Sequence, residues 1–147
     1  MDNQNLLLDY YVTEVLSVTQ AHAKGVVVPA KPLLMVSVID YINQGKCSDN
    51  KIIFTDLIDF YDTNLKLTNA CVTPMSYPFY FMGSESFWHL RWKNQFIKTK
   101  APSAKFIREN IEYAYLDNAL WDLLQEEQVR QQLRETIVTH FLSRKTN

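Results

Sequence analysis

The segment "KPLLMVSVIDYINQG", residues 31–45, limits how this chain can fold more than any other part of the sequence. A helix at a protein surface carries apolar residues along one side, but here they fall on nearly every side of the helix. They are Leu33, Leu34, Val36, Val38, Ile39 and Ile42. Pro32 suits the first turn of a helix, and Gly45 suits the position just past its end. The sequence therefore predicts a central helix that the rest of the chain buries.

Capping residues followed by apolar residues at helical spacing indicate further helices. The first is expected to begin at Asp2, to run to about His22 and to stop at Gly25. The helices after the central one are expected at residues 55–67 with Thr55 as the cap, 103–115 with Ser103 as the cap, 118–124 with Asp117 as the cap, and 126–142. The predicted fold class is therefore mainly α.

A small β element is expected among these helices. Branched side chains and Pro29 keep residues 26–30 extended, and the "KIIF" run at 51–54 suits a short strand or an extended lead-in. Pro, Gly and Ser after Leu67 favour a loop over 68–77, followed by strands at 87–93 and 95–99 that pair as a hairpin. The class becomes α+β, mainly α with a small β hairpin, in a single domain of 147 residues.

Several function classes find no support in the sequence. The N-terminus carries acids where a signal peptide needs basic residues, and no apolar run approaches the ~20 residues that span a bilayer, so we expect a cytoplasmic protein with no membrane partner. Cys47 and Cys71 lack metal-ligand spacing, and the three glycines stand apart, so neither a metal nor a cofactor site is indicated. His22, His89 and His140 are scattered, and no catalytic grouping forms around them. We expect no enzyme activity.

Charge is distributed unevenly along the chain, although the formal net charge is only -1. Between Ser86 and Arg108 six basic residues stand without any Asp or Glu, whereas seven acids and two basic residues lie between Glu109 and Glu135. The six are Arg91, Lys93, Lys98, Lys100, Lys105 and Arg108, and we call them the basic block. Such a field suits a phosphate backbone, although lysines protecting a sheet edge would give the same pattern.

An aromatic run such as "YPFYFM", residues 77–82, more often belongs to the buried core than to a ligand-binding site. Alternate side chains of an extended segment point to opposite sides, so we expect part of this run to be exposed beside the basic block.

Four segments together resemble the sulfur-binding domain of modification-dependent (type IV) restriction endonucleases. They are "PAKPLLMVSVIDYI", "IIFTDLIDFY", "YPFYFMGSESFWHLRWK" and "LRETIVTHFL", within residues 23–142. The most specific parts are the Lys-Pro-Leu-Leu helix start and the Tyr-Pro-Phe segment, which Trp88 follows nine residues after Phe79. In such nucleases the domain precedes an HNH catalytic domain, which this sequence lacks. The resemblance implies a recognition module, to which a nuclease domain can be joined in the parent chain.

The resemblance implies binding of double-stranded DNA in which sulfur replaces a non-bridging phosphate oxygen. Tyr77 and Pro78 match an apolar cup for the sulfur, Phe81 stands at the next cup position, where a smaller side chain can occur, and Lys31 matches a basic residue near the modified phosphate. The residues expected at the DNA backbone or groove are Lys24, His89, Arg91, Lys93, Lys98, Lys100, Lys105 and Arg108.

Two other functions remain open at this point. One is a DNA-binding module of the same fold without sulfur selectivity, and the other is a protein-interaction domain whose basic face meets an acidic partner. Salt-dependent binding of matched duplexes with and without one sulfur separates all three.

Overall fold

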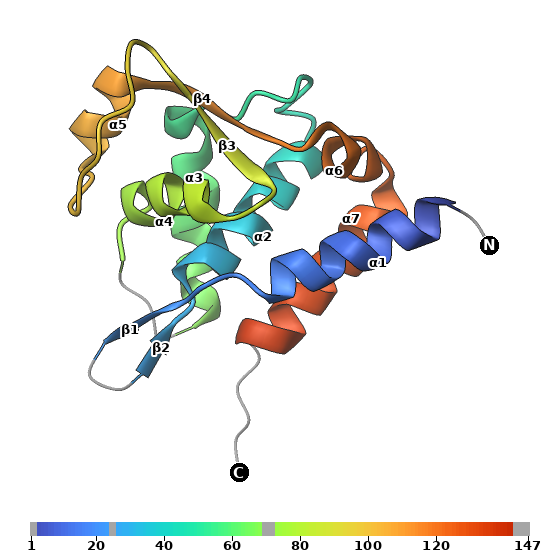
Figure 1. Cartoon of the computed structure of the whole chain (residues 1–147). Coiled ribbons are helices and arrows are strands. Elements are labelled where there is room, and N and C mark those ends of the chain that lie inside the picture. Colours follow the sequence, from blue (N-terminus) through green and yellow to red (C-terminus); the bar gives the residue numbers. More distant parts are fainter. Residues whose placement is uncertain (1–2, 24–25, 69–72, 143–147) are drawn as a thin grey trace.

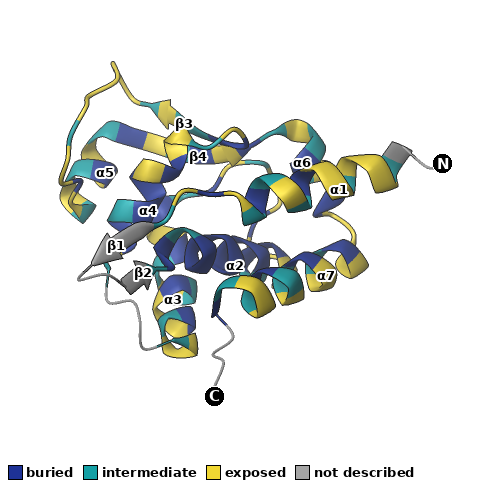
Figure 2. Ribbon diagram, turned by 60° about the horizontal axis from the view of Figure 1, so that its bottom comes forward, coloured by how far each residue is buried: buried dark blue, intermediate teal, exposed yellow. Residues whose placement is uncertain are grey.

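Helix α2, Ala30–Asn43, crosses the middle of the molecule and is enclosed by the other elements (Figure 2). All of its residues are buried except Lys31, Asp40 and Asn43. The helix ends at Asn43 with Gln44 as its C-cap, and Gly45 follows with a φ of 72°, a left-handed conformation that glycine adopts without strain. The predicted central helix and its stop are thus confirmed.

The computed structural model describes residues 3–23, 26–68 and 73–142 (Figure 1). The α-helices besides α2 are α1 Asn3–Leu16, α3 Phe54–Asn64, α4 Ser76–Phe81, α5 Ala104–Asn110, α6 Asn118–Leu123 and α7 Glu127–Ile137. Short 3-10 turns, η1 Leu65–Leu67 and η2 Met82–Ser84, extend α3 and α4, and a π turn, η3 Val138–Leu142, extends α7. The strands are β1 Ala21–Ala23, β2 Val26–Val28, β3 Trp88–Trp92 and β4 Ile111–Leu116.

The strands form two antiparallel pairs within the described part of the chain, β1 with β2 and β3 with β4. In the second pair Trp88 lies opposite Leu116, and the register shifts between Arg91 and Trp92. Ile52, from the "KIIF" run, adds an isolated bridge to Ala114. The mainly helical class with a small β element is confirmed.

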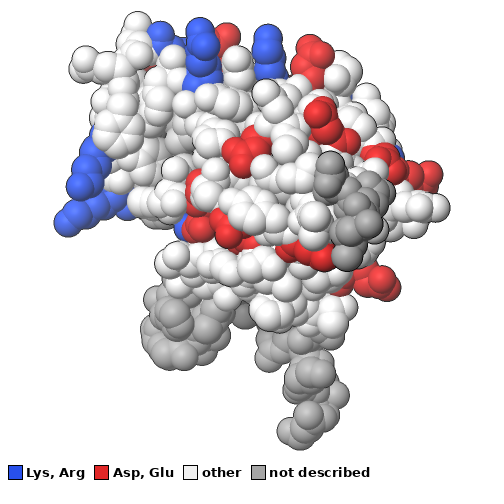
Figure 3. Space-filling model, turned by 45° about the vertical axis from the view of Figure 1, so that its right-hand side comes forward, with Lys and Arg blue, Asp and Glu red and all other residues white. Residues whose placement is uncertain are grey.

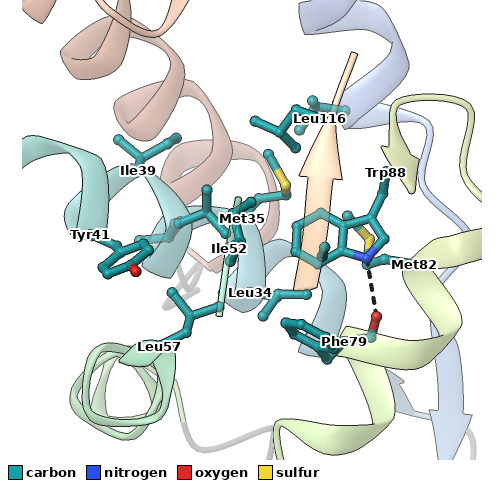
Figure 4. Close-up of a cluster of buried hydrophobic side chains, with 14 of the residues drawn as sticks. Leu34, Met35, Ile39, Tyr41, Ile52, Leu57, Phe79, Met82, Trp88 and Leu116 are labelled. Carbon is teal, nitrogen blue, oxygen red and sulfur yellow. Dashed lines mark hydrogen bonds between the residues drawn. The ribbon is translucent and has the colours of Figure 1, made fainter. Parts of the chain in front are cut away.

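The core lies between α2 and the elements packed on it, which include α3, α4 and α7 (Figure 4). Trp88 on β3 is fully buried, and its Nε1 donates a hydrogen bond to the carbonyl oxygen of Phe79 on α4 at 3.1 Å. On another side of α2, Arg134 donates to both oxygens of Asp40, at 2.7 and 3.1 Å. Helices α4 and α7 therefore both pack against α2, and β3 is bonded to α4.

Several predicted boundaries are wrong. The first helix ends at Leu16 and His22 lies in β1, while Asp2 and Gly25 lie outside the described residues. Helix α3 begins at Phe54, so Thr55 is inside it and not its cap. Ser103 does cap α5, accepting a hydrogen bond from the Phe106 amide at 3.0 Å, but the helix stops at Asn110.

The residues after Asn110 form β4 because pairing with β3 overrides their helical spacing. Ile111, Ala114 and Leu116 are buried, while Glu112 and Tyr115 on the same strand are exposed. The predicted hairpin partner is also wrong, since β3 pairs with β4 and residues 95–99 form no strand.

No helix in residues 3–23, 26–68 and 73–142 is both long and apolar enough to cross a membrane.

Candidate nucleic-acid interface

The Tyr-Pro-Phe segment is helix α4, where the sequence predicted a loop followed by extended chain. Pro78 is tolerated there because it lies in the first turn, whose backbone N–H groups have no partner within the helix. Tyr77 and Phe81 are four residues apart and lie on the same side of α4, with ring centroids 6.2 Å apart. Tyr77 is partly buried and Phe81 is 37% exposed.

Pro78 is buried, although the resemblance places it in the cup together with Tyr77 and Phe81. The reason is the helical period, which turns Pro78 and Phe79 toward the core when Tyr77 and Phe81 face outward. The exposed apolar surface at this position therefore comes from the rings of Tyr77 and Phe81.

Lys31 lies in the first turn of α2, which packs against α4. Its Nζ donates a hydrogen bond to Glu85 Oε2 at 2.6 Å, and each of the two side chains is only 12% exposed. The same Glu85 oxygen accepts the backbone amide of Thr19 at 3.1 Å. The fold thus brings Lys31 to the segment that directly follows η2, and it compensates the charge of Lys31 with that of Glu85.

A groove of about 680 Å³ lies between α4, η2, β3 and the segment 96–99. Aromatic rings dominate its lining, and Phe96, 64% exposed, is the most accessible of them. The lining residues are Tyr80, Phe81, Gly83, Ser84, Trp88, His89, Leu90, Trp92, Phe96, Lys98, Thr99 and Tyr115. One predicted cup residue and two predicted DNA-contact residues, Phe81, His89 and Lys98, therefore meet at one concave surface.

Tyr80 holds the outer wall of this groove. Its hydroxyl donates to the Ile97 carbonyl and accepts the Thr99 amide, both at 3.1 Å. These two bonds bracket Lys98 and fix the backbone on either side of it. Residues 96–99 are therefore anchored by a side chain of α4 and not by strand pairing.

The basic block lies on β3, on the segment that follows it and on α5. Arg91 is 3.8 Å from Glu112, with side chains 62% and 56% exposed, and Lys93 donates to the Arg108 carbonyl at 2.7 Å. Within the described ranges no ion pair involves Lys98, Lys100, Lys105 or Arg108, and all four are exposed. In Figure 3, Lys and Arg side chains gather along the upper and left edges, and acidic side chains cover the middle and right. Lys24 lies outside the described residues.

His89 is held by Asp117, which precedes α6. The Nε2 of His89 lies 2.6 Å from Asp117 Oδ1. The other carboxylate oxygen of Asp117 accepts a hydrogen bond from the Tyr11 hydroxyl at 2.9 Å. Burial, with the hydrogen bond to Asp117, raises the pKa of Tyr11 to about 12. His89 also packs against Tyr115, with ring centroids 5.1 Å apart. His89 is therefore fixed in place at the groove.

The described residues offer no group of three or more His, Cys, Asp or Glu side chains that could hold a metal ion. Cys47 is buried, and burial raises the pKa of its thiol to about 11, so it remains a protonated thiol at neutral pH.

Sequence reasoning missed Glu85, Tyr80, Trp92, Phe96 and Tyr115. Glu85 stands directly before the acid-free stretch, and this position is the only signal that the sequence offers for it. The four aromatic residues come together through the pairing of β3 with β4 and the bonds of Tyr80, which no local pattern indicates.

The fold resembles that of a sulfur-binding domain. The match is to a solved structure described as the sulfur-binding domain and SRA domain of ScoMcrA complexed with phosphorothioated DNA. The TM-score is 0.70 at 13% sequence identity, and the match covers 89% of this chain and 42% of the solved chain. No family model and no curated protein matches the chain.

The resemblance that the sequence predicted is thus confirmed as a shared fold. This chain spans less than half of the matched chain's length, and the similarity falls on its sulfur-binding domain.

Proposed function

We propose that this chain binds double-stranded DNA that carries a phosphorothioate in its backbone, as the recognition module of a restriction system. The observation that carries the proposal is the shared fold with the ScoMcrA sulfur-binding domain, whose solved structure contains phosphorothioated DNA. The rings of Tyr77 and Phe81, together with Pro78 on the same helix α4, which packs against α2, are the proposed cup for the sulfur.

Sulfur suits an apolar cup because it is larger and less well hydrated than the oxygen it replaces. Burying a few tens of Å² of sulfur surface contributes on the order of 1 kcal/mol at ~25 cal/mol per Å². An oxygen in the same place would lose its water without gaining a partner, which costs roughly 1–3 kcal/mol. These two effects together favour modified over ordinary DNA by one to a few factors of ten.

The exposed cations of the basic block supply affinity in this proposal. Lys98, Lys100, Lys105 and Arg108 are free to neutralise phosphates, and such contacts position DNA without distinguishing sulfur from oxygen. Four phosphates neutralised on duplex DNA give a slope of log affinity against log salt of about −4. The aromatic groove next to Lys98 offers apolar surface to base edges or sugars.

The test is a titration of two duplexes of the same sequence, one with a single phosphorothioate and one without, at several salt concentrations. Tighter binding of the modified duplex by tenfold or more supports the proposal. Equal, salt-dependent binding of both duplexes indicates a DNA-binding module without sulfur selectivity. Absence of salt-dependent binding to either duplex favours a protein-interaction domain with an acidic partner.

A further inference from the structure

Glu85 forms an ion pair with Lys31 that differs in kind from the ion pair between Arg91 and Glu112 on the proposed DNA surface. Lys31 Nζ and Glu85 Oε2 are 2.6 Å apart, with 12% of each side chain exposed. Arg91 and Glu112 are 3.8 Å apart, with 62% and 56% exposed. Water and salt screen an exposed pair far more than a buried one, so the charge of Glu85 acts on its surroundings with little attenuation.

The position of Glu85 is fixed by more than Lys31. Its Oε2 also accepts the Thr19 amide, so segments before β1, at the start of α2 and after η2 converge on one carboxylate. Because the Lys31 side chain is mostly buried, the ammonium cannot swing away from this partner without rearrangement of the chain around it.

The resemblance places Lys31 near the modified phosphate, and its helix α2 packs against α4, which carries the proposed cup. If the Lys31 ammonium lacked a counter-charge, it would favour unmodified DNA over phosphorothioate DNA. Oxygen accepts charge-assisted hydrogen bonds strongly, whereas sulfur is a weak acceptor. A free Lys31 would therefore strengthen binding of an ordinary phosphate more than binding of a phosphorothioate.

We infer that Glu85 is a specificity-determining residue. By neutralising Lys31 it weakens the binding of a phosphate oxygen, so that the apolar cup determines which duplex binds more tightly. The inference rests on the proposed function and adds to it a residue that discriminates against unmodified DNA. Glu85 contributes to selectivity through repulsion of the competitor and not through attraction of the preferred ligand.

The first experiment compares Glu85→Gln with Glu112→Gln on the two duplexes. Gln at position 85 keeps an oxygen for the Thr19 amide and removes only the charge. We expect Glu85→Gln to tighten binding of the unmodified duplex about tenfold and of the modified duplex about threefold, because oxygen accepts a charge-assisted hydrogen bond from Lys31 more strongly than sulfur does. The ratio of modified to unmodified affinity then falls about threefold, and Glu112→Gln leaves that ratio unchanged.

A second comparison uses Lys31→Met and the double variant Lys31→Met/Glu85→Gln, in which an uncharged pair replaces the ion pair. Such replacements are often neutral or stabilising for the fold, so the double variant is informative even where Glu85→Gln does not fold. With Lys31 absent, the remaining carboxylate repels any phosphate, and we expect the double variant to bind both duplexes about tenfold more tightly than Lys31→Met.

The outcomes separate this inference from the proposed function. Wild-type protein that binds both duplexes alike overturns both. Wild-type selectivity with a Glu85→Gln ratio equal to that of Glu112→Gln, or equal affinities of Lys31→Met and the double variant, overturns the role of Glu85 alone. A lowered ratio in Glu85→Gln, together with tighter binding by the double variant, supports it.

Discussion

The cup region and the basic block both carry positive charge, but the fold treats that charge differently. Lys31 is 12% exposed and paired with Glu85 at 2.6 Å, whereas Lys98 and Lys100 project into solvent. An exposed cation acts on every phosphate within about a Debye length, and a buried, compensated one acts only on a ligand in direct contact. In the proposed function this difference separates two tasks, with the basic block attracting any DNA and the cup selecting modified DNA.

The apolar side chains beside these two sets of cations also differ in how firmly the fold fixes them. Tyr77 and Phe81 stand on a helix whose inner side is part of the core, so their positions are set by packing. Phe96 is 64% exposed on a segment held by the Tyr80 hydroxyl. We therefore expect the cup to be rigid and the outer wall of the groove to adapt to its ligand.

The largest effect is expected from Trp88, which joins the two regions. It lies on β3 with the basic block, and it donates to Phe79 on α4 from a fully buried position. Trp88→Ala should lower the free energy of unfolding by about 3–5 kcal/mol, because it removes a large buried side chain and a hydrogen bond. Urea denaturation followed by circular dichroism measures this loss.

Trp121→Ala, at a partly buried position on α6, is the matched control and should cost less than half as much. A loss of less than about 1 kcal/mol for Trp88→Ala would mean that the two regions do not share one core.

The second prediction tests the cup alone. Tyr77→Ser removes one of its two rings and should lower the ratio of modified to unmodified affinity by on the order of tenfold, since the sulfur loses its apolar contact. The salt slope should stay unchanged, because no cation is altered. Tyr10→Ser, at a 50% exposed position on α1, is the control and should leave the ratio as it is. Retention of the full ratio by a folded Tyr77→Ser protein would remove the cup from the proposal.

The sequence was most informative where one physical effect dominates. An all-round apolar helix can only be buried, so α2 and its stop near Gly45 were predictable. The cap at Ser103 was predictable because it depends on residues within a few positions. Asp117 does precede α6, but its side chain makes no capping hydrogen bond and instead contacts His89 and Tyr11. The resemblance to the sulfur-binding domain was carried by such local segments as well.

The predictions of secondary structure and of charge pairing failed where contacts between distant segments of the chain determine the structure. Helix α4 forms although its Pro and Ser residues favour a turn, since the proline falls in the first turn and burial of Phe79 compensates for low helix propensity. Residues 111–116 become β4 because β3 is available to pair with them, and the pairing of Lys31 with Glu85 spans parts of the chain that no local spacing relates. The residues of the two regions stay a prediction from the sequence, whereas no sequence pattern indicated that Glu85 compensates the charge of Lys31.

The third prediction tests the basic block alone. Lys98→Ala should flatten the slope of log affinity against log salt by about one unit, if Lys98 neutralises one phosphate. Both duplexes should bind more weakly by the same factor, so their ratio stays constant. Lys66→Ala, an exposed lysine on η1 outside the basic block, is the control and should change neither quantity. An unchanged slope for Lys98→Ala would place the DNA surface elsewhere.

The smallest change in the salt slope is expected at Arg91, which belongs to the basic block but is partly paired, as Lys31 is in the cup region. Arg91 belongs to the basic block but lies 3.8 Å from Glu112, so part of its field is already cancelled in the free protein. Because both side chains are mostly exposed, water screens the pair and the cancellation is incomplete. Arg91→Ala should therefore change the salt slope by less than Lys98→Ala, about half a unit or less, without altering the ratio between the duplexes. Anisotropy titrations of the modified duplex at four salt concentrations distinguish the two slopes. A change of a full unit in the salt slope of Arg91→Ala would mean that Glu112 exerts no influence on DNA binding. The contrast between paired and unpaired cations would then hold only for the buried pair of Lys31 and Glu85.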